Sequence, residues 1–356
     1  MARQKNPLRE RGVNSSDIAR RVGLSRTTVS YVLNNRQDVS IPEATRAKVL
    51  AAAKRLGYRP NSIARSLVRG KTSTIGVIVP SLELSSTADA VDGIEAECSR
   101  KGHRILLAYS HNDPDMEAEQ ARMLLEHRVD GIIGVVGYRT LAGTKRWLQE
   151  ADAEQVPCVV ADSSVPGVQV DYVVGDDRSG AFTAVTHLHR LGHRRIAHLS
   201  AGELGSPACE RREGYRAALL ATGIAIDPKL VAGSSFEPED AALAMVGLLE
   251  LPKPPTAVFA ADDMMAAVAI DVIRDRGLRV PQDLAVVGFN DMRLARFLRL
   301  TTVRLLARER GRLTINRLFA RMMDPHLPKE GIIVPTQLVV RESCGAALPA
   351  AAPSMK

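Results

Sequence analysis

Several features that would place the chain in common protein classes are missing. Over its 356 residues, no uninterrupted hydrophobic run reaches the roughly 18 residues that a transmembrane helix needs. The first residues lack the apolar core of a secretory signal, so we expect a cytoplasmic protein. The four cysteines lie far apart without a Cys-x-x-Cys pair, which argues against a disulfide framework or a zinc site. No cofactor is expected.

Positive charge is concentrated at one end of the chain. Residues 1–70 contain 15 Lys and Arg against 4 Asp and Glu, whereas the remainder contains 33 against 36. The net charge of +8 therefore comes entirely from the first fifth of the sequence. A local cationic excess is typical of binding to a polyanion, and the rest of the chain is predicted to be a nearly neutral globule.

The basic end carries a helix-turn-helix pattern over residues 17–34. We expect three short helices between residues 14 and 57. Gly23 supplies the turn after the first helix, Ser25 caps the second, and Pro42 opens the third. The expected inward-facing side chains are Ile18 and Val22, then Val29, Val32 and Leu33, then Val49, Leu50, Ala53 and Leu56.

From residue 74 onward, strand-like apolar segments alternate with helical ones. Continuous apolar strands bounded by helices predict parallel sheets that are covered on both faces. About nine or ten such strands exceed one comfortable sheet. We therefore expect an α/β fold of two doubly wound lobes, with ligands bound at the carboxyl ends of the strands. The clearest strands are residues 75–79, 105–108, 131–136, 156–161, 172–174, 195–199, 257–260 and 284–288.

Four stretches stand out because of their order and spacing. They are the helix-turn-helix; Gly57-Tyr58-Arg59-Pro60-Asn61 with Ala64-Arg65-Ser66-Leu67; Leu191-Gly192-His193-Arg194-Arg195-Ile196-Ala197; and Val286-Val287-Gly288-Phe289-Asn290-Asp291 with Leu300-Thr301-Thr302-Val303. Together they resemble the lactose-repressor/galactose-repressor (LacI/GalR) family of bacterial regulators, from Asp17 to about Ser343. The resemblance implies a DNA-binding headpiece, a hinge helix, a homodimer, and a two-lobed effector domain similar to periplasmic sugar-binding proteins.

Composition and resemblance together suggest a domain organisation. The expected parts are a basic disordered arm (1–13), a helix-turn-helix DNA-binding domain (14–60), a hinge helix and linker (61–73), a two-lobed effector-binding and dimerisation domain (74–345), and a tail (346–356). Lobe 1 is expected over about 74–173 and 304–335, and lobe 2 over about 174–303 and 336–345. The tail contains no leucine heptad, which favours a dimer over a tethered tetramer.

These expectations describe a sequence-specific DNA-binding transcriptional regulator that is not an enzyme. We expect a repressor that binds a palindromic operator on double-stranded DNA as a dimer, without contact with a membrane. A sugar or sugar-like effector would control it by shifting the population of two lobe arrangements. The alternatives are an effector-activated regulator, or a co-repressor-dependent repressor with a purine or nucleoside ligand.

The resemblance also places the DNA contacts. The second helix would lie in the major groove, where Arg26 and Thr27 choose the operator and Arg26 can offer a bidentate fork to a guanine. Tyr31 replaces an arginine that is common in the family, and Leu67 would wedge into the minor groove. A plain linker is the alternative reading of residues 61–70. The full expected DNA-binding set is Ser25, Arg26, Thr27, Ser30, Tyr31, Asn34, Asn61, Ala64 and Leu67.

The effector contacts implied by the resemblance are Leu84, Ser86, Asp162, Arg211, Phe236, Asp262 and Asn290. Arginine and carboxylates can bind hydroxyl groups, and Phe236 offers a flat face for a sugar ring or a base. Asp262 stands where the family usually has asparagine, and Asn290 where it usually has aspartate. The alternative is that Arg211 belongs to a surface charge cluster with Arg212 and Glu213, and that Phe236 is a core residue.

Two other protein classes fit the sequence less well. No Gly-x-Gly-x-x-Gly or Walker sequence follows a strand, which argues against a nucleotide-dependent enzyme. His187, His189, His193 and His198 could suggest a metal site. However, His187 and His189 would face apart on a helix and no acidic cluster joins them, so we expect structural roles and no bound metal. A solute-binding transport protein is opposed by the basic headpiece and the missing signal.

Overall fold

The computed structural model describes residues 13–34, 36, 38–58, 71–82, 85–137, 139–202 and 205–346. The chain divides into two compact units, Met1–Thr72 and Ser73–Lys356. The expected arm up to residue 12, the core of the expected hinge at residues 61–70, and the tail from residue 347 lie outside the described residues.

The first unit contains the three predicted helices. They are α1 (Ser15–Val22), α2 (Arg26–Leu33) and α3 (Glu43–Leu56). Gly23 ends α1 with a φ of 69°, a left-handed conformation that glycine adopts without a steric penalty. Ser25 caps α2, because its side chain accepts a hydrogen bond from the backbone N–H of Thr28 at 3.0 Å. The third helix begins one residue later than predicted, since Pro42 keeps an extended backbone and takes the N-cap position.

A small hydrophobic core joins these three helices. Its buried members are Ile18, Ala19, Val22, Val29, Val32, Val49, Ala52 and Ala53. The prediction that Leu50 faces this core is wrong, because half of its surface (50%) is exposed. Leu50 lies about 100° around the helix from Val49, and the next turn reaches the core through two alanines instead.

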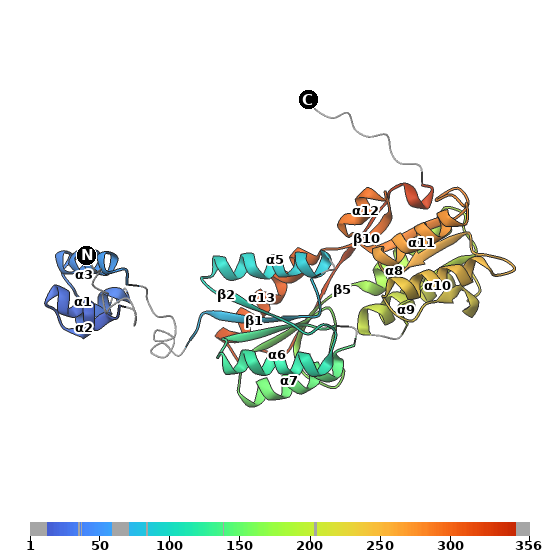
Figure 1. Cartoon of the computed structure of the whole chain (residues 1–356). Helices are drawn as coiled ribbons and strands as arrows, with labels where there is room; N and C mark the ends of the chain where they lie inside the picture. Colours follow the sequence, from blue (N-terminus) through green and yellow to red (C-terminus); the bar gives the residue numbers. More distant parts are fainter. Residues whose placement is uncertain are drawn as a thin grey trace, which may run out of the picture. The chain divides into compact units, whose positions relative to one another are not determined.

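The second unit consists of two lobes, each built on a six-stranded sheet (Figure 1). The first sheet, in lobe 1, has the order β11-β5-β4-β3-β1-β2 and is parallel throughout. Its strands are β1 (Thr74–Val79), β2 (Arg104–Tyr109), β3 (Gly131–Val135), β4 (Cys158–Ala161), β5 (Asp171–Gly175) and β11 (Gly331–Val334). Figure 1 shows α5 (Ser85–Arg100) and α13 (Ala307–Met323) on one face, with α6 (Pro114–Glu126) and α7 (Leu141–Ala153) on the other.

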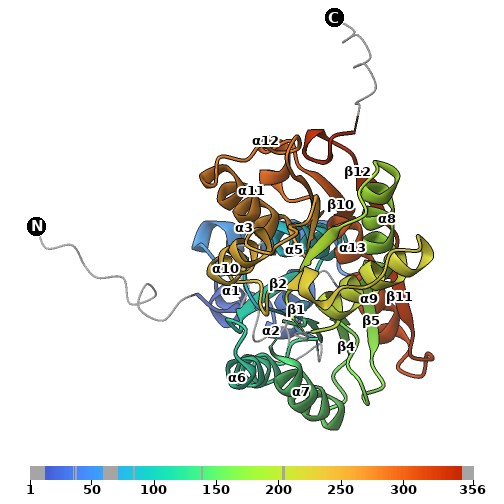
Figure 2. The ribbon, with the colours of Figure 1, turned by 90° about the vertical axis from the view of Figure 1, so that its right-hand side faces the viewer.

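The second sheet, in lobe 2, has the order β12-β10-β9-β8-β6-β7. Its strands are β6 (Ile196–Leu199), β7 (Val231–Ala232), β8 (Ala257–Ala260), β9 (Ala285–Asn290), β10 (Thr301–Leu305) and β12 (Thr336–Val339). In Figure 2, α8 (Asp177–Arg190) and α9 (Gly205–Ala221) cover one face, and α10 (Pro238–Leu249) and α11 (Asp263–Asp275) the other. The short elements are α12 (Arg293–Phe297), η1 (Pro228–Leu230) and η2 (Glu342–Cys344).

The two doubly wound lobes are as predicted, but the strand count differs. The described residues form twelve strands instead of about nine or ten, and β12 runs antiparallel to β10. The strands named from the sequence do not include β7, β10, β11 and β12. Strand β7 has only two residues, and β11 and β12 lie at sheet edges, where their side chains are partly exposed. Strand β10 lies inside the sheet, but its sequence TTVRL mixes polar and apolar residues. An edge strand can join a parallel sheet in the opposite direction, as β12 does here.

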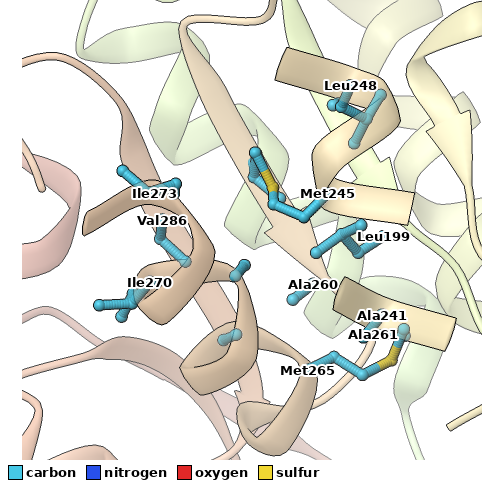
Figure 3. Packing of buried hydrophobic residues seen from close by; sticks show 14 of the residues in the cluster. Leu199, Ala241, Met245, Leu248, Ala260, Ala261, Met265, Ile270, Ile273 and Val286 are labelled. Atoms are coloured by element: carbon cyan, nitrogen blue, oxygen red, sulfur yellow. The ribbon is translucent and has the colours of Figure 1, made fainter. Parts of the chain in front are cut away.

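Helices and strands in lobe 2 enclose a core of small and medium-sized apolar side chains (Figure 3). Met245 and Leu248 from α10 face Leu199, Ala260 and Val286 from three neighbouring strands. Removing this apolar surface from water supplies the main favourable free energy for the lobe. None of the described helices is both long and apolar enough to cross a membrane.

The chain crosses between the lobes three times. It leaves lobe 1 after β5, returns after β10 to form α13 and β11, and leaves again to form β12. Both lobes are therefore built from separate stretches of sequence. The first two crossings bring Asp177 and Leu305 to the junction between the sheets.

Candidate functional site

Side chains from both lobes line one cavity of about 130 Å³ at the carboxyl ends of the strands. Six of the seven predicted effector residues line it, although they come from six different segments of the chain. They are Ser86, Asp162, Arg211, Phe236, Asp262 and Asn290. The seventh, Leu84, lies outside the described residues.

Arg211 lines this cavity and is buried, with 4% of its surface exposed. Its Nε donates to Asp177 Oδ1 at 2.7 Å, and its Nη1 donates to the carbonyl oxygen of Ala261 at 2.7 Å. Its Nη2 donates to Asn290 Oδ1 at 3.1 Å, and its guanidinium carbon lies 4.0 Å from the centroid of the Phe289 ring. The alternative of a surface charge cluster is therefore wrong for Arg211.

A second ion pair, formed by two residues of lobe 1, also lines the cavity. Nη2 of Arg310, on α13, is 2.6 Å from Asp162 Oδ1, and Arg310 is 4% exposed. Its Nε is buried without a hydrogen-bond partner among the described residues. Neither Arg310 nor Asp177 is among the residues predicted from the sequence. Asp177 could have been found, because it follows the predicted strand 172–174, but Arg310 lies within a helix and has no such signal.

Burial raises the pKa of two carboxyl groups that line the cavity. Desolvation raises the pKa of Asp177, and the positive charges of Arg211 and Arg310 partly offset this shift. Desolvation also raises the pKa of Asp262. Asp262 caps α11 by accepting a hydrogen bond from the backbone N–H of Met265 at 2.7 Å.

Backbone strain marks two of the cavity residues. Asp162 follows β4 with a φ of 70°, and Asn290 ends β9 with a φ of 103°. Such positive values are uncommon for residues other than glycine and cluster at functional sites. Both turns point a polar side chain from a strand end into the cavity wall.

Phe236 combines the two roles considered for it. It packs against the core of lobe 2 as a partly buried residue, and it also lines the cavity. Asn112 lines the opposite wall, and its buried Oδ1 has no hydrogen-bond partner among the described residues. The cavity thus offers an aromatic surface and an unused acceptor to a small molecule.

The predicted DNA-binding residues lie on α2 and at its ends. Arg26 and Thr27 are exposed in its first turn. Ser30 and Asn34 bond to each other, because Asn34 Nδ2 donates to Ser30 O at 2.9 Å and to Ser30 Oγ at 3.2 Å. Ser25 acts as the cap described above, and Tyr31 lies one turn after Thr27. Asn61, Ala64 and Leu67 lie outside the described residues.

Comparison with known proteins assigns the chain to a family. Residues 16–61 match the model of bacterial regulatory proteins, lacI family, and residues 185–344 match a periplasmic binding protein-like domain. The chain is 33% identical over 329 residues to the HTH-type transcriptional repressor PurR of Mannheimia succiniciproducens, which covers 92% of this chain and 97% of that protein. The chain belongs to the lacI family.

Solved structures agree with this assignment. The transcriptional regulator CelR in complex with cellobiose has a TM-score of 0.70 and 31% identity, covering 93% of this chain and 99% of that one. The lac repressor dimer bound to operator and the anti-inducer ONPF has a TM-score of 0.82 and 27% identity, covering 94% and 99%. This lacI-family protein is a DNA-binding transcriptional repressor with an effector domain, and not an enzyme. The resemblance, the fold class and the regulatory function predicted from the sequence are confirmed.

The histidines of this lacI-family protein lie in separate surroundings. His187 Nε2 is 3.3 Å from Cys344 Sγ, and His193 Nδ1 is 3.0 Å from Thr256 Oγ1. The described residues contain no cluster of three His, Cys, Asp or Glu side chains that could hold a metal ion.

His198 is fully buried between two aromatic rings of lobe 2. Its ring centroid lies 5.1 Å from those of both Tyr215 and Phe259. Its Nδ1 is 3.0 Å from the carbonyl oxygen of Phe259, so the neutral ring carries its proton on Nδ1 and donates it there. Desolvation lowers the pKa of His198 from 6.5 to about 4.

We predict that His198 makes lobe 2 less stable in acid. Between pH 6.5 and about 4 the unfolded chain binds a proton that the folded chain rejects, so the free energy of unfolding falls as the pH falls. The loss contributed by this ring should reach about 3 kcal/mol. Urea unfolding of the wild type and of His198→Gln at several pH values measures it, and the variant should lose that part of the pH dependence. An unchanged pH dependence would contradict the prediction.

Proposed function

We propose that this protein represses transcription in the cytoplasm by binding a twofold-symmetric operator as a homodimer. A small effector held between the lobes controls that binding. The observation that carries this proposal is the cavity in which Ser86, Asp162, Arg211, Phe236, Asp262 and Asn290 meet. The dimer is supported by the similar lac repressor, whose structure is that of a dimer bound to operator.

The charges of the cavity favour an uncharged polar effector. Its described lining contains three carboxylates, on Asp162, Asp177 and Asp262, but only two guanidinium groups. Both guanidinium groups are already paired with carboxylates at 2.6 to 2.7 Å. An anion would therefore find no unpaired cation there, whereas hydroxyl or amide donors can bind the carboxylates and Asn112 Oδ1. A sugar stacked on Phe236 fits this chemistry, and the related CelR structure is a cellobiose complex.

The position of the cavity suggests how the effector acts. Asp162 belongs to lobe 1, and Arg211 and Asp262 to lobe 2, so a ligand that contacts both sides favours one arrangement of the lobes. We propose that residues 61–73 act as the hinge that transmits this arrangement to the headpiece. Within that hinge, Asn61, Ala64 and Leu67 would contact the minor groove, while Ser25, Arg26, Thr27, Ser30, Tyr31 and Asn34 bind the major groove and its phosphates.

Selection from random duplex DNA with the full-length protein tests the proposal. We expect one palindromic sequence to be enriched, and native mass spectrometry of the complex should give two chains per duplex. The selected duplex then serves in a titration with neutral sugars, amino sugars, nucleosides and sugar phosphates. A neutral sugar should change operator affinity at least tenfold, whereas a sugar phosphate should not.

The cavity itself is tested with one variant and one control. Phe236→Ala should abolish the response to the active ligand while the variant still binds the operator. Phe182→Ala removes a phenyl ring from the partly exposed face of α8 and should leave the response intact. Failure to enrich any sequence would refute the proposal that this protein binds an operator. A response to nucleosides would show that the effector is of the purine type and not a sugar.

A further inference from the structure

The recognition helix ends in a contact that the sequence pattern does not reveal. Tyr31 follows Thr27 by four residues on α2, so the two side chains share the exposed helix face. The guanidinium carbon of Arg36 lies 5.3 Å from the centroid of the Tyr31 ring, a cation–π contact. A cationic group is therefore present at Tyr31 although residue 31 itself carries no charge.

Four contacts hold Arg36 in place although half of its side chain (51%) is exposed. Its backbone N–H donates to the carbonyl oxygen of Tyr31 at 3.0 Å, and its own carbonyl accepts from Arg46 Nη2 at 3.4 Å. Its side-chain Nε donates to Asp38 Oδ1 at 2.5 Å. Its Nη2 donates to Asp38 Oδ2. Because the guanidinium is fixed before any partner arrives, binding through it costs little side-chain entropy.

The carboxylate of Asp38 occupies only one edge of this guanidinium. Asp38 accepts hydrogen bonds from the Nε–Nη2 edge of Arg36. The Nη1–Nη2 edge stays available to another partner, because Nη1 has no hydrogen-bond partner among the described residues. Two parallel N–H donors at one end of an arginine match the O6 and N7 acceptors of guanine in the major groove. The free edge of Arg36 is thus suited to one base.

The same carboxylate makes a phosphate contact less favourable. Asp38 neutralises the charge of Arg36 and would itself be repelled by the phosphate backbone. A base edge carries no net charge, so it can accept the two hydrogen bonds without that repulsion. The Arg36–Asp38 pair is therefore better suited to a base edge than to a backbone phosphate.

We infer that Arg36, stacked on Tyr31 and oriented by Asp38, reads a guanine in each operator half-site and sets the base preference of this repressor at that position. The inference rests on the proposed binding of a twofold-symmetric operator. It adds a residue outside the recognition helix to the DNA-reading set. Tyr31 and Asp38 are then positioning residues that act through Arg36.

The test compares sequence preference among full-length variants. The wild type, Arg36→Ala, Arg36→Lys and Arg55→Ala are each taken through selection from random duplex DNA, followed by fluorescence anisotropy on the enriched duplex and on its single-base variants. Arg36→Ala should lose the preference for guanine at one position per half-site by about 5- to 150-fold and keep the preference elsewhere. Arg36→Lys should not restore it, because lysine lacks the planar fork.

The controls separate recognition of a base by Arg36 from sequence-independent electrostatic attraction to DNA. Arg55 is an exposed cation in the last turn of α3, so Arg55→Ala should weaken all duplexes alike. Tyr31→Phe keeps the ring and should retain the guanine preference, whereas Tyr31→Leu should reduce it. Asp38→Asn should raise affinity for non-operator DNA and flatten the preference.

The outcomes distinguish this inference from the proposed function. If the wild type enriches an operator and Arg36→Ala enriches the same one with the same single-base ratios, the inference is overturned while the repressor stands. If Arg55→Ala changes the base preference as Arg36→Ala does, the guanine contact is also refuted. If the wild type itself enriches nothing, the proposed operator binding fails, and the inference with it.

Discussion

Arg211→Met should abolish the effector response and lower the free energy of unfolding of the effector domain by about 3–5 kcal/mol. The substitution keeps an unbranched, flexible side chain but leaves Asp177, which is 5% exposed, without its ion-pair partner. It also strips the hydrogen bonds from the Ala261 carbonyl and from Asn290. Urea unfolding and effector titration measure the two losses.

Two further variants test whether the stability loss of Arg211→Met comes from leaving Asp177 without its ion-pair partner. Arg216→Met removes an exposed cation from the same helix and should change stability by less than about 0.5 kcal/mol. The double variant Arg211→Met/Asp177→Asn should recover a large part of the stability, because neither charge of the Arg211–Asp177 pair remains to be buried without its partner. The pKa of Asp177, already raised by burial, should rise further in Arg211→Met, so its defect should shrink as the pH falls. A defect of equal size in the double variant would contradict the explanation.

Gly311→Ala should destabilise lobe 1 by about 3 kcal/mol or more. A Cβ atom at Gly311 would lie 2.0 Å from the carbonyl oxygen of Ala90, and one at Gly93 would lie 2.1 Å from the carbonyl oxygen of Arg308. Helices α5 and α13 therefore touch backbone to backbone, and neither partner is a flexible side chain that could move away. Thermal or urea unfolding of the full-length protein measures the effect.

The same substitution at Gly247 is the matched control. Gly247 lies within α10, and a Cβ atom there would meet nothing within 4 Å. Gly247→Ala should therefore leave stability unchanged or raise it by about 0.5–1 kcal/mol. Equal effects of the two substitutions would show that helix propensity, and not the close approach of α5 and α13, governs both sites.

Much of the cavity could be predicted from the sequence because its residues follow strands. Asp162, Asp262 and Asn290 each stand at the carboxyl end of an apolar segment, where parallel sheets bind their ligands. The resemblance places residues 304–335 in lobe 1, but nothing in the sequence marks Arg310 within that helical segment as a cavity residue. Ion pairing across 148 positions, as between Asp162 and Arg310, depends on the tertiary fold alone.

The cavity shows how Arg211 is paired when residue 290 is an asparagine. The resemblance leads one to expect an aspartate at residue 290, and in this chain Asp177 supplies the carboxylate partner of Arg211. An uncharged acceptor at residue 290 then completes the hydrogen bonds of the guanidinium without adding a further buried charge. The sequence analysis singles out residues 262 and 290 but not Asp177, the carboxylate that pairs with Arg211.

In the headpiece, local patterns predicted all three helices but misplaced one side chain. Leu50 was expected in the core because it is apolar and adjacent to Val49, yet hydrophobic identity does not fix the direction of a residue on a helix. The Tyr31–Arg36 contact was equally hidden, since it depends on how the chain turns back after α2.

The return of the chain to lobe 1 bears on how a ribosome can deliver this protein. Helix α13 and strand β11 are made after nearly all of lobe 2, yet Ile315, Leu318, Phe319 and Val334 complete the core of lobe 1. The sheet made first must therefore wait, with the face that α13 later covers shielded only by α5, while about 130 further residues are synthesised, which at ordinary elongation rates takes several seconds. During that interval the nascent chain exposes a surface of the kind that chaperones bind, and messages truncated before α13 would yield aggregating fragments.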